Sequence, residues 1–517
     1  MAGTISRGAA ARTGLRVGLI GAVAVAAIFA TLVAGSFVGF IESDDLEYAL
    51  NATAWLESPP HLGGSHWGLR HLIVLPIAAS FAVLGRGEVP LLLPTMLYAA
   101  GTVALMGLCV ARVAGAMAGV LAALLVASLP VVLTGASMVY SDTTETFFVL
   151  ASVWAYWFAT RSGNPWLFVA SGVLAGGAFI TRETTVALLG LYAVLFLMAP
   201  RRIMDFVRMG AGFLAVVGLD TALLWAASGD PLWRLSVSSR GVAGDNPALP
   251  QFQVNTGGLD RHGVIVAPRP IQALLAIFAN QLMGLLPWAA VPAAIALARR
   301  PRPADPQAAD ARSAALHFAG LALVWFLLLS YAFTFMWIVP RYQTVAMVAL
   351  CVPLAVWLAG RIEAGAWRLP ALLVLAILGC GAVLSLVADR ELLFGERGLV
   401  AFARATEGQG PIRADPATLR GADWPLQVAG QRARVSAGPC EPGLLCYVNP
   451  RPRRTLPAGW VRQEVPEGAT MLLEVPRGRS MVAVILARSG LLAFMPGAVR
   501  AKLDGPPLVA RGFRMPG

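Results

Sequence analysis

The sequence predicts an all-α polytopic membrane protein with a small β-containing domain at its C-terminal end. Three observations support this fold class. Hydrophobic residues make up 57% of the 517 residues and charged residues only 13%, about half the charged fraction of soluble proteins. Apolar runs long enough to cross a hydrocarbon core recur as far as residue 388. Beyond residue 389, Pro, Gly and Arg become frequent, and short alternating runs replace the long ones.

These changes in composition predict two parts, a transmembrane domain at residues 1–389 and a C-terminal extracytoplasmic domain at residues 390–517. The mean hydropathy of +0.69 is too high for a soluble enzyme. The formal net charge is +12, but long translocated domains tolerate basic charge. Basic residues are not interleaved with aromatic ones, so we expect no nucleic-acid partner.

The first apolar run, residues 17–41, follows three arginines and is too long for the apolar core of a signal peptide. We therefore expect an uncleaved first span with the N-terminus inside the cell. The run ends at an acidic stretch that contains Asp44, Asp45 and Glu47, which this topology puts at the outer face. Residues 44–58 then predict a short helix on the membrane surface.

A second short apolar run, residues 72–85, follows a turn-rich polar passage. Its 14 residues fall short of the roughly 20 needed to cross the bilayer. If it did cross, Arg112 and every later arginine cluster would change sides, against the positive-inside rule. We therefore predict a second juxtamembrane helix in the first outer loop.

With that choice the chain has about eleven spans, and the C-terminal domain lies outside the cell (cytoplasmic or inner) membrane. A long outer loop at residues 229–269 separates the seventh span from the eighth. The ten spans after the first are residues 89–111, 114–139, 143–160, 165–181, 184–200, 209–228, 270–298, 313–339, 342–360 and 369–388.

The C-terminal part predicts a small independent domain. Residues 471–475 and 481–486 are short runs that we interpret as strands. Cys440 and Cys446 could form a disulfide if this part is outside the cytosol.

This topology gathers charged residues at the outer ends of several spans, on one face of the membrane. A carboxylate there could take a proton from an acceptor hydroxyl, which accelerates reactions by roughly two to four orders of magnitude. An arginine could neutralise a departing phosphate through paired hydrogen bonds. The pattern therefore suits transfer of a group from a lipid phosphate. The residues are Asp44, Asp45, Glu47, Asp142, Glu145, Arg182, Glu183 and Arg341, with His66, Arg70 and His71 from the turn-rich passage.

The order and spacing of these residues resemble the polytopic lipid-phosphate-sugar glycosyltransferases of the GT-C type, glycosyltransferase family 39. This family includes the protein O-mannosyltransferases and the enzymes that add aminoarabinose to lipid A. The resemblance covers about residues 10–390. Asp44-Asp45 with Tyr48 corresponds to the acidic pair and tyrosine of the family's first outer loop, although the family usually has Asp-Glu. Further correspondences are Tyr140-Ser141-Asp142, the passage ending in Arg182-Glu183, Asp230-Pro231, and Pro340-Arg341-Tyr342.

The resemblance implies a polyprenyl-phosphate sugar donor and inverting transfer to a protein, glycolipid or cell-wall glycan. It implies catalytic roles for Asp44, Asp45 and Asp142, with Asp44 as the leading candidate for the base. We expect no cofactor and no metal, although some relatives use a divalent cation near the first acidic loop. The implied substrate-binding residues are Tyr48, His66, Arg70, Arg182, Glu183 and Arg341; Arg182 and Arg341 would hold the phosphate.

Other interpretations stay open at this point. A transporter or lipid flippase would place polar residues near the midplane in repeated halves, whereas here the charges gather at one face and the sequence shows no repeated halves. A non-catalytic scaffold for the outer domain would tolerate loss of the acids. Single acids beyond a span are often only solvated, and His66 and His71 suit structural roles. Asp220, inside the seventh span, suits a bond to a neighbouring helix through Asn280 or Gln281.

Overall fold

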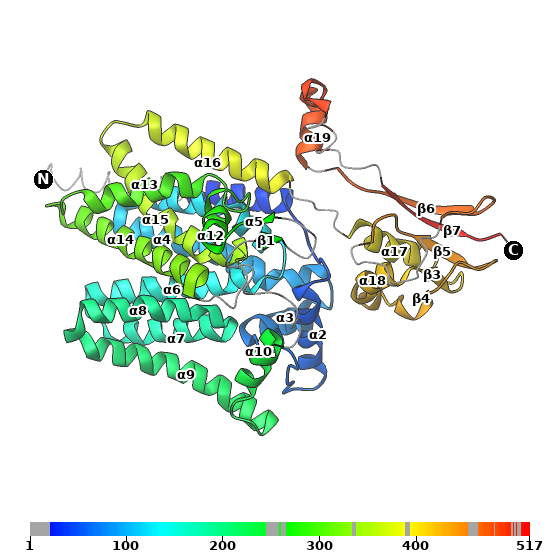
Figure 1. Ribbon diagram of the computed structural model, residues 1–517, viewed down its shortest axis with the longest axis horizontal. Helices are drawn as coiled ribbons and strands as arrows, with labels where there is room; N and C mark the ends of the chain where they lie inside the picture. The colour runs from blue at the N-terminus through cyan, green and yellow to red at the C-terminus, as the bar shows by residue number, and fades with distance from the viewer. Residues whose placement is uncertain are drawn as a thin grey trace, which may run out of the picture.

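The computed structural model describes residues 21–243, 258–259, 265–332, 338–387, 393–452, 464–479, 481–497, 500, 503 and 508–516. A bundle of helices leads into a smaller domain with a mixed sheet, which lies beyond one end of the bundle (Figure 1). In the described part of the chain, five helices are long and apolar enough to cross a membrane. They are Glu88–Ala127, Pro200–Ser228, Pro306–Ala332, Pro340–Glu363 and Arg368–Leu386. The chain is therefore a largely helical membrane protein with several spans; the count of eleven stays a prediction.

The bundle contains both long and short helices. The first is Gly21–Gly35. It is followed by α2 (Asp44–Glu57), α3 (His71–Leu84), α4 (Glu88–Ala127), α5 (Pro130–Ala136), α6 (Ser141–Ser162), α7 (Pro165–Thr181), α8 (Val186–Met198), α9 (Ile203–Ser228), α10 (Trp233–Ala243), α12 (Arg269–Phe278), α13 (Leu286–Arg299), α14 (Pro306–Leu327), α15 (Thr344–Glu363) and α16 (Arg368–Val387). A two-stranded ribbon, β1 (Gly258–Leu259) with β2 (Ile265–Val266), lies between α10 and α12.

The two predicted short helices are confirmed as α2 and α3, whereas their place in an outer loop stays a prediction. They lie at the end of the bundle that faces the C-terminal domain (Figure 1). The first helix ends at Gly35, earlier than predicted, and residues 36–43 connect it to α2 without regular secondary structure. Tyr48 and Ala49 of α2 pack with Ile73 and Ile77 of α3 in one small core, so burial of these apolar faces holds the loop together.

Helix α4 consists of two limbs that meet at Gly115, where φ is +87° and the chain reverses. The limbs pack closely because small residues face each other. A Cβ added at Gly119 would lie 2.6 Å from the carbonyl oxygen of Gly107. The limbs correspond to the predicted spans 89–111 and 114–139, except that the second is completed by the separate helix α5, which begins at Pro130.

The prediction that residues 270–298 form a single spanning helix is wrong. It forms α12 and α13, separated by residues 279–285. The break begins with Asn280, whose side chain accepts a hydrogen bond from the amide of Leu282 at 2.9 Å, as in an Asx turn. Gly284, at φ +59°, completes the change in direction.

Helix α14 continues into a π-helical turn, Leu328–Ala332. A π-helical turn leaves carbonyl groups without their usual α-helical partners, and Arg269 donates to two of them. Its Nε lies 2.5 Å from the oxygen of Ser330 and its Nη2 lies 3.4 Å from that of Leu329. Residues 333–337, the end of this predicted span, lie outside the described residues. A 3-10 turn, Pro340–Gln343, then leads into the buried helix α15.

The C-terminal domain is built on a five-stranded sheet in the order β4-β3-β5-β7-β6. Strand β3 is parallel to β4 and β5, whereas β7 is antiparallel to β5 and β6. Cys440 and Cys446 form a disulfide. The elements are α17 (Phe394–Ala405), β3 (Ile412–Ala414), α18 (Pro416–Val428), β4 (Val435–Ala437), β5 (Leu445–Val448), β6 (Thr470–Pro476), α19 (Met481–Arg488), a 3-10 turn (Leu491–Phe494) and β7 (Val509–Arg514).

Of the two predicted strands in this domain, one is confirmed and one is wrong. Residues 471–475 lie in β6, whereas 481–486 lie in helix α19. A continuous apolar run does not distinguish a strand from a buried or interfacial helix. The predicted boundary at 389/390 falls at residues 388–392, outside the described residues, so the division stays a prediction.

The C-terminal domain packs against the loop that follows the first helix. The ring of Trp424 lies 4.9 Å from that of Phe40 and 6.4 Å from that of Phe81, centroid to centroid. Nη2 of Arg397 donates to the carboxylate of Glu88 at 2.7 Å and to the carbonyl oxygen of Val38 at 3.0 Å. Because the same Glu88 oxygen also accepts the amide of Phe40 at 2.7 Å, one carboxylate ties the domain to this loop.

Candidate active site

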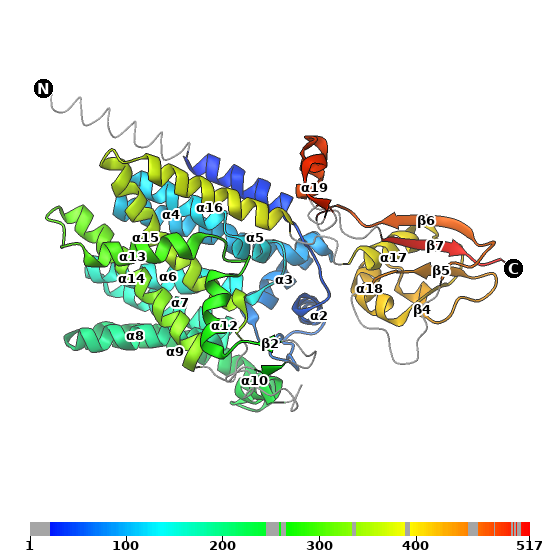
Figure 2. The ribbon, with the colours of Figure 1, turned by 45° about the horizontal axis from the view of Figure 1, so that its top comes forward.

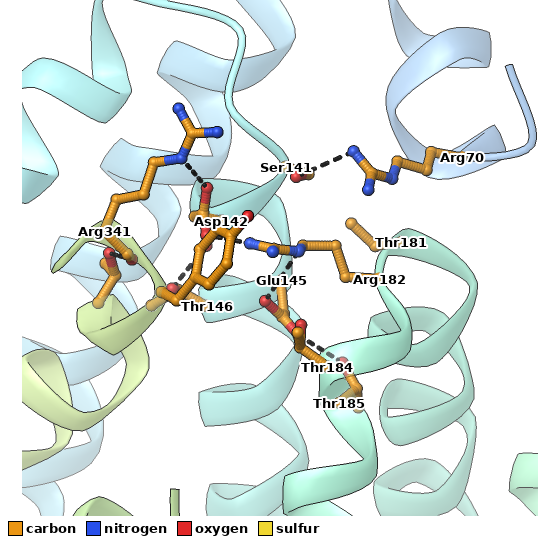
Figure 3. Close-up of polar contacts among 12 residues, drawn as sticks. Arg70, Ser141, Asp142, Glu145, Thr146, Thr181, Arg182, Thr184, Thr185 and Arg341 are labelled. Atoms are coloured by element: carbon orange, nitrogen blue, oxygen red, sulfur yellow. Dashed lines mark hydrogen bonds and ion pairs between the residues drawn. The ribbon is translucent and has the colours of Figure 1, made fainter. Parts of the chain in front are cut away.

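A buried ion pair joins the start of α6 to the end of α7. Asp142 lies in the first turn of α6 and is only 6% exposed. Nη1 of Arg182, the residue that ends α7, donates a hydrogen bond to Oδ1 of Asp142 (Figure 3). Arg182 is also buried, and its guanidinium lies 4.2 Å from the ring centroid of Tyr342. Burial by itself lowers the pKa of Arg182, but Asp142 and Glu145 more than reverse this, so the pKa is raised and the charge is permanent.

Glu145 supports this arginine from the next turn of α6. Its Oε1 accepts hydrogen bonds from the hydroxyls of Thr184 at 2.5 Å and Thr185 at 2.9 Å, and its Oε2 lies 3.9 Å from Nε of Arg182 (Figure 3). The sequence interpretation named Glu145 but gave it no role. Its spacing of three residues from Asp142 puts both carboxylates on one helix face. This spacing is the feature of the sequence that could have indicated a shared role.

Arg341 lies between two of the predicted catalytic acids. Its Nη2 is 3.6 Å from Oδ2 of Asp44, and its Nε is 3.5 Å from Oδ2 of Asp142. Arg341 therefore contacts the Asp142 oxygen that Arg182 does not use. Its guanidinium also lies 4.4 Å from the ring centroid of Tyr140. The Asp44 and Arg341 side chains are 22% and 28% exposed, so this part of the site is open. We call Asp44, Asp142, Arg182 and Arg341 the reaction cluster.

Asp45 does not join this cluster. Its Oδ2 accepts the amide of Ile41 and its Oδ1 accepts that of Ser43, both at 2.6 Å. Oδ1 also accepts the amide of Leu46 at 3.1 Å, and the residue is 1% exposed. The carboxylate thus shapes the turn that begins α2 and leaves its neighbour Asp44 facing Arg341.

Tyr48 and Arg70 form a buried link beside the cluster. Tyr48 is fully buried, and its hydroxyl accepts a hydrogen bond from Nη1 of Arg70 at 2.5 Å. The same nitrogen lies 3.3 Å from the hydroxyl of Ser141, next to Asp142 (Figure 3). Burial raises the pKa of Tyr48 although Arg70 opposes it, so the phenol stays protonated. The link joins α2 and the segment before α3 to α6.

His66 lies close to the cluster but stacks on a neighbour. Its ring is 3.8 Å from that of Trp67, centroid to centroid. Burial, followed by the charge of Arg70, lowers the pKa of His66 to about 4. The imidazole is therefore neutral at physiological pH and suits hydrogen bonding to an uncharged group better than binding to a phosphate.

Glu183, the remaining predicted binding residue, faces α10. Its Oε1 accepts a hydrogen bond from Ser238 at 2.9 Å and lies 3.8 Å from Nη1 of Arg234. Arg234 was not predicted as a site residue. It also donates to the carbonyl oxygen of Leu69 at 2.5 Å, so it joins the loop before α3 to the loop after α7. Sequence offers no signal for this residue, because it lies in the long segment between two predicted spans.

A second buried charged group contains Asp220. Its Oδ1 lies 2.7 Å from Nδ1 of His71, and its Oδ2 accepts a hydrogen bond from Nε of Arg234 at 2.8 Å. The partners expected from sequence, Asn280 and Gln281, were therefore wrong, and the structural role of Asp220 stays a prediction. We call His71, Asp220 and Arg234 the anchor cluster.

Among the described residues, no group of three or more His, Cys, Asp or Glu side chains is placed to hold a metal ion. In the reaction cluster each carboxylate faces a guanidinium. This donor set suits an anion that shares the arginines with the carboxylates.

Part of the chain matches a known protein family. Residues 72–225 match the family model described as dolichyl-phosphate-mannose-protein mannosyltransferase. That stretch contains α3 from its second residue onward, all of α4 to α8 and most of α9, and therefore includes Asp142, Arg182 and Asp220. No curated protein sequence matches the chain.

Several solved structures are similar to the chain. ArnT from Cupriavidus metallidurans, bound to undecaprenyl phosphate, has a TM-score of 0.55 and 12% sequence identity, with 96% of this chain and 97% of that chain covered. At that identity the likeness shows the fold. The oligosaccharyltransferase AglB from Archaeoglobus fulgidus, in complex with an inhibitory peptide and a dolichol-phosphate, has a TM-score of 0.47 and 10% identity, covering 80% of this chain and 64% of that chain. That second likeness is too weak to bear on the fold.

Proposed function

We propose that this chain transfers one sugar from a polyprenyl-phosphate carrier to an acceptor at the outer face of the membrane, with inversion. It is a membrane glycosyltransferase, and its residues 72–225 match the dolichyl-phosphate-mannose-protein mannosyltransferase family. The acceptor would be a protein, a glycolipid or a cell-wall glycan. The undecaprenyl phosphate bound to ArnT, which shares the fold, supports a lipid-phosphate donor.

One observation carries the proposal: Arg341 lies between Asp44 and Asp142 at 3.6 and 3.5 Å. These separations exceed the 2.7–2.9 Å typical of charge-assisted hydrogen bonds. The contacts are therefore loose, and the guanidinium can turn toward a phosphate. Arg182 holds the other oxygen of Asp142. Two arginines thus flank a position beside a partly exposed carboxylate.

The chemistry follows from this arrangement. The acceptor hydroxyl oxygen attacks the anomeric carbon of the donor sugar, and the bond from that carbon to the phosphate oxygen breaks. Asp44 takes the hydroxyl proton, and the electron pair of the broken bond leaves on polyprenyl phosphate. Arg182 and Arg341 stabilise the added negative charge through hydrogen bonds. Attack from the face opposite the phosphate inverts the anomeric centre.

The other residues act as positioning groups in this proposal. Glu145 and Asp142 hold Arg182 in place, and Asp45 holds the turn from which Asp44 projects. The Tyr48–Arg70 link keeps the first outer loop against α6.

The proposal includes the predicted topology of about eleven spans, with the N-terminus inside and residues 390–517 outside. Helix α2, which begins with Asp44, lies at the end of the bundle that faces the C-terminal domain (Figure 1), which supports a single outer face. The lipid chain of the donor would lie in the bilayer beside the spans.

The test is Asp44→Asn in the purified full-length protein, assayed with a panel of polyprenyl-phosphate sugars and envelope acceptors. We expect transfer to fall by roughly two to four orders of magnitude, with unchanged insertion and thermal stability. Glu57→Gln is the matched control, because Glu57 lies on the same helix in an exposed pair with Arg86 at 2.6 Å. Near-normal turnover by Asp44→Asn would remove Asp44 as the base. Lipid movement across vesicles without any sugar transfer would favour the flippase alternative.

A further inference from the structure

The segment at residues 481–497 has no part in the site. It consists of helix α19, a turn at Gly490 with φ +75°, and the 3-10 turn Leu491–Phe494. Residues 481–500 contain two arginines and no acidic residue. The strand predicted here would have belonged to the sheet, whereas the helix lies away from it (Figures 1 and 2).

Large apolar side chains on this segment are exposed. The exposed fraction is 50% for Ile485, 52% for Leu491 and 87% for Phe494. Ala483 and Leu492 are buried, so the segment has an inner face and an outer apolar face. Three large apolar side chains exposed together mark a contact surface.

The neighbours of α19 identify what this surface meets. Helix α19 contacts α16 and runs across the end of it, in both views (Figures 1 and 2). Helix α16 is apolar and long enough to span a membrane, and its Leu372, Leu375 and Val383 are 65%, 68% and 52% exposed. In a membrane protein such side chains face lipid. The apolar surface of residues 481–497 therefore begins where the lipid-facing surface of a span ends.

The charges on the segment fit the same neighbour. Arg488 ends α19 and is exposed, and Arg500 follows the 3-10 turn and is also exposed. Arginines beside an apolar face are typical of helices that lie in the headgroup region, where they meet lipid phosphates.

We propose that residues 481–497 lie in the outer headgroup region of the bilayer, with Ile485, Leu491 and Phe494 inserted among the acyl chains. The segment thereby fixes the C-terminal domain to the lipid surface at a second point, separate from its contact with the first outer loop. This proposal depends on the membrane fold and not on the proposed reaction.

The test uses nitroxide spin labels on the full-length protein in vesicles of phosphatidylcholine and phosphatidylglycerol. Cys109, Cys351 and Cys380 are first replaced by Ala, and the Cys440–Cys446 disulfide is kept. Labels are attached at Phe494→Cys and, in a separate sample, at Ile485→Cys. The matched control is Leu472→Cys, because Leu472 is 41% exposed and apolar but lies on β6.

Accessibility to oxygen, which concentrates in lipid, is compared with accessibility to a water-soluble nickel complex. We expect the oxygen-to-nickel ratio to be several-fold higher at residues 494 and 485 than at residue 472. Equal ratios at all three positions would overturn the proposal. Protection of residues 494 and 485 from both reagents would also overturn it and would instead indicate contact with a second copy or another protein. Using two labelled positions keeps the test valid if one label disturbs the fold.

Discussion

The reaction cluster and the anchor cluster use the same kinds of residue and differ in how tightly they are paired. In the anchor cluster both oxygens of Asp220 have partners within 2.8 Å, and Asp220 and His71 are almost fully buried. In the reaction cluster Arg341 lies 3.5 and 3.6 Å from its two carboxylates, and Asp44 is partly exposed.

This difference separates residues that stabilise the fold from residues that are available to a substrate. A buried carboxylate with short hydrogen bonds to all its partners has no capacity left for a ligand, and disturbing it exposes an uncompensated charge. A looser and partly exposed group can exchange its partner for a substrate. The comparison predicts that changes at Asp44 and Arg341 act on rate, whereas changes in the anchor cluster act on stability.

After Asp44→Asn, the largest effect is expected for Arg341→Ala. Loss of the group that we propose stabilises the departing phosphate should lower turnover by about 10²–10³-fold, with little change in thermal stability because the pairs it makes are long. Turnover and the thermal midpoint in detergent would be measured on the same preparation. Arg86→Ala is the control, since Arg86 makes only an exposed pair with Glu57 in the described structure. A large loss of stability with normal turnover per folded molecule would instead indicate that Arg341 stabilises the fold.

Asp220→Asn should show the opposite pattern. The amide cannot satisfy both His71 and Arg234 as an anion does, and we expect a loss of about 1–3 kcal/mol in the free energy of unfolding. Turnover per folded molecule should change far less. Thermal unfolding would be followed beside Asp205→Asn, on the same helix in a more exposed pair with Arg208. Equal stability of the two variants would remove the distinction between the clusters.

A smaller effect is expected where the C-terminal domain meets the first outer loop. Arg397→Ala removes a pair whose side chains are 39% and 38% exposed, which is worth about 0.2–1 kcal/mol. Because Glu88 also holds the amide of Phe40, we expect a few-fold fall in turnover. Arg404→Ala, exposed on the same helix, is the control. If the two variants behaved alike, this contact would not position the loop.

The smallest effect concerns His66, which responds to charges of the reaction cluster. With a pKa of about 4 it is neutral from pH 5 to 8, so His66→Gln should leave the shape of the rate–pH profile unchanged there. The unfolded chain binds a proton near pH 6.5 and the folded chain only near pH 4. Stability should therefore fall as pH drops through this window, and His66→Gln should reduce that slope. A titration of the rate near pH 6.5 that disappears in His66→Gln would contradict this expectation.

Sequence predicted the class of fold and much of the cluster, because hydropathy and the positive-inside rule place residues on one face of the membrane. It could not separate Asp44 from Asp45. These two adjacent acids differ only in whether backbone amides or a distant arginine meet them, and this depends on tertiary contacts. The same limit hid Arg234, whose partners lie 14 to 165 residues away. Within the bundle, the break at residues 279–285 depends on local turns that hydropathy does not register.

Strand β7 is the last strand along the chain, yet it lies between β5 and β6 in the sheet. During synthesis the sheet therefore stays unfinished until residues 509–514 emerge. Trp424 and Arg397, which cover the loop bearing Asp44, belong to this late-maturing domain. Because of this order of synthesis, the loop beside the reaction cluster is among the last parts of the molecule to reach its native conformation. Loss of β7 alone would delay or prevent the packing of the C-terminal domain on that loop.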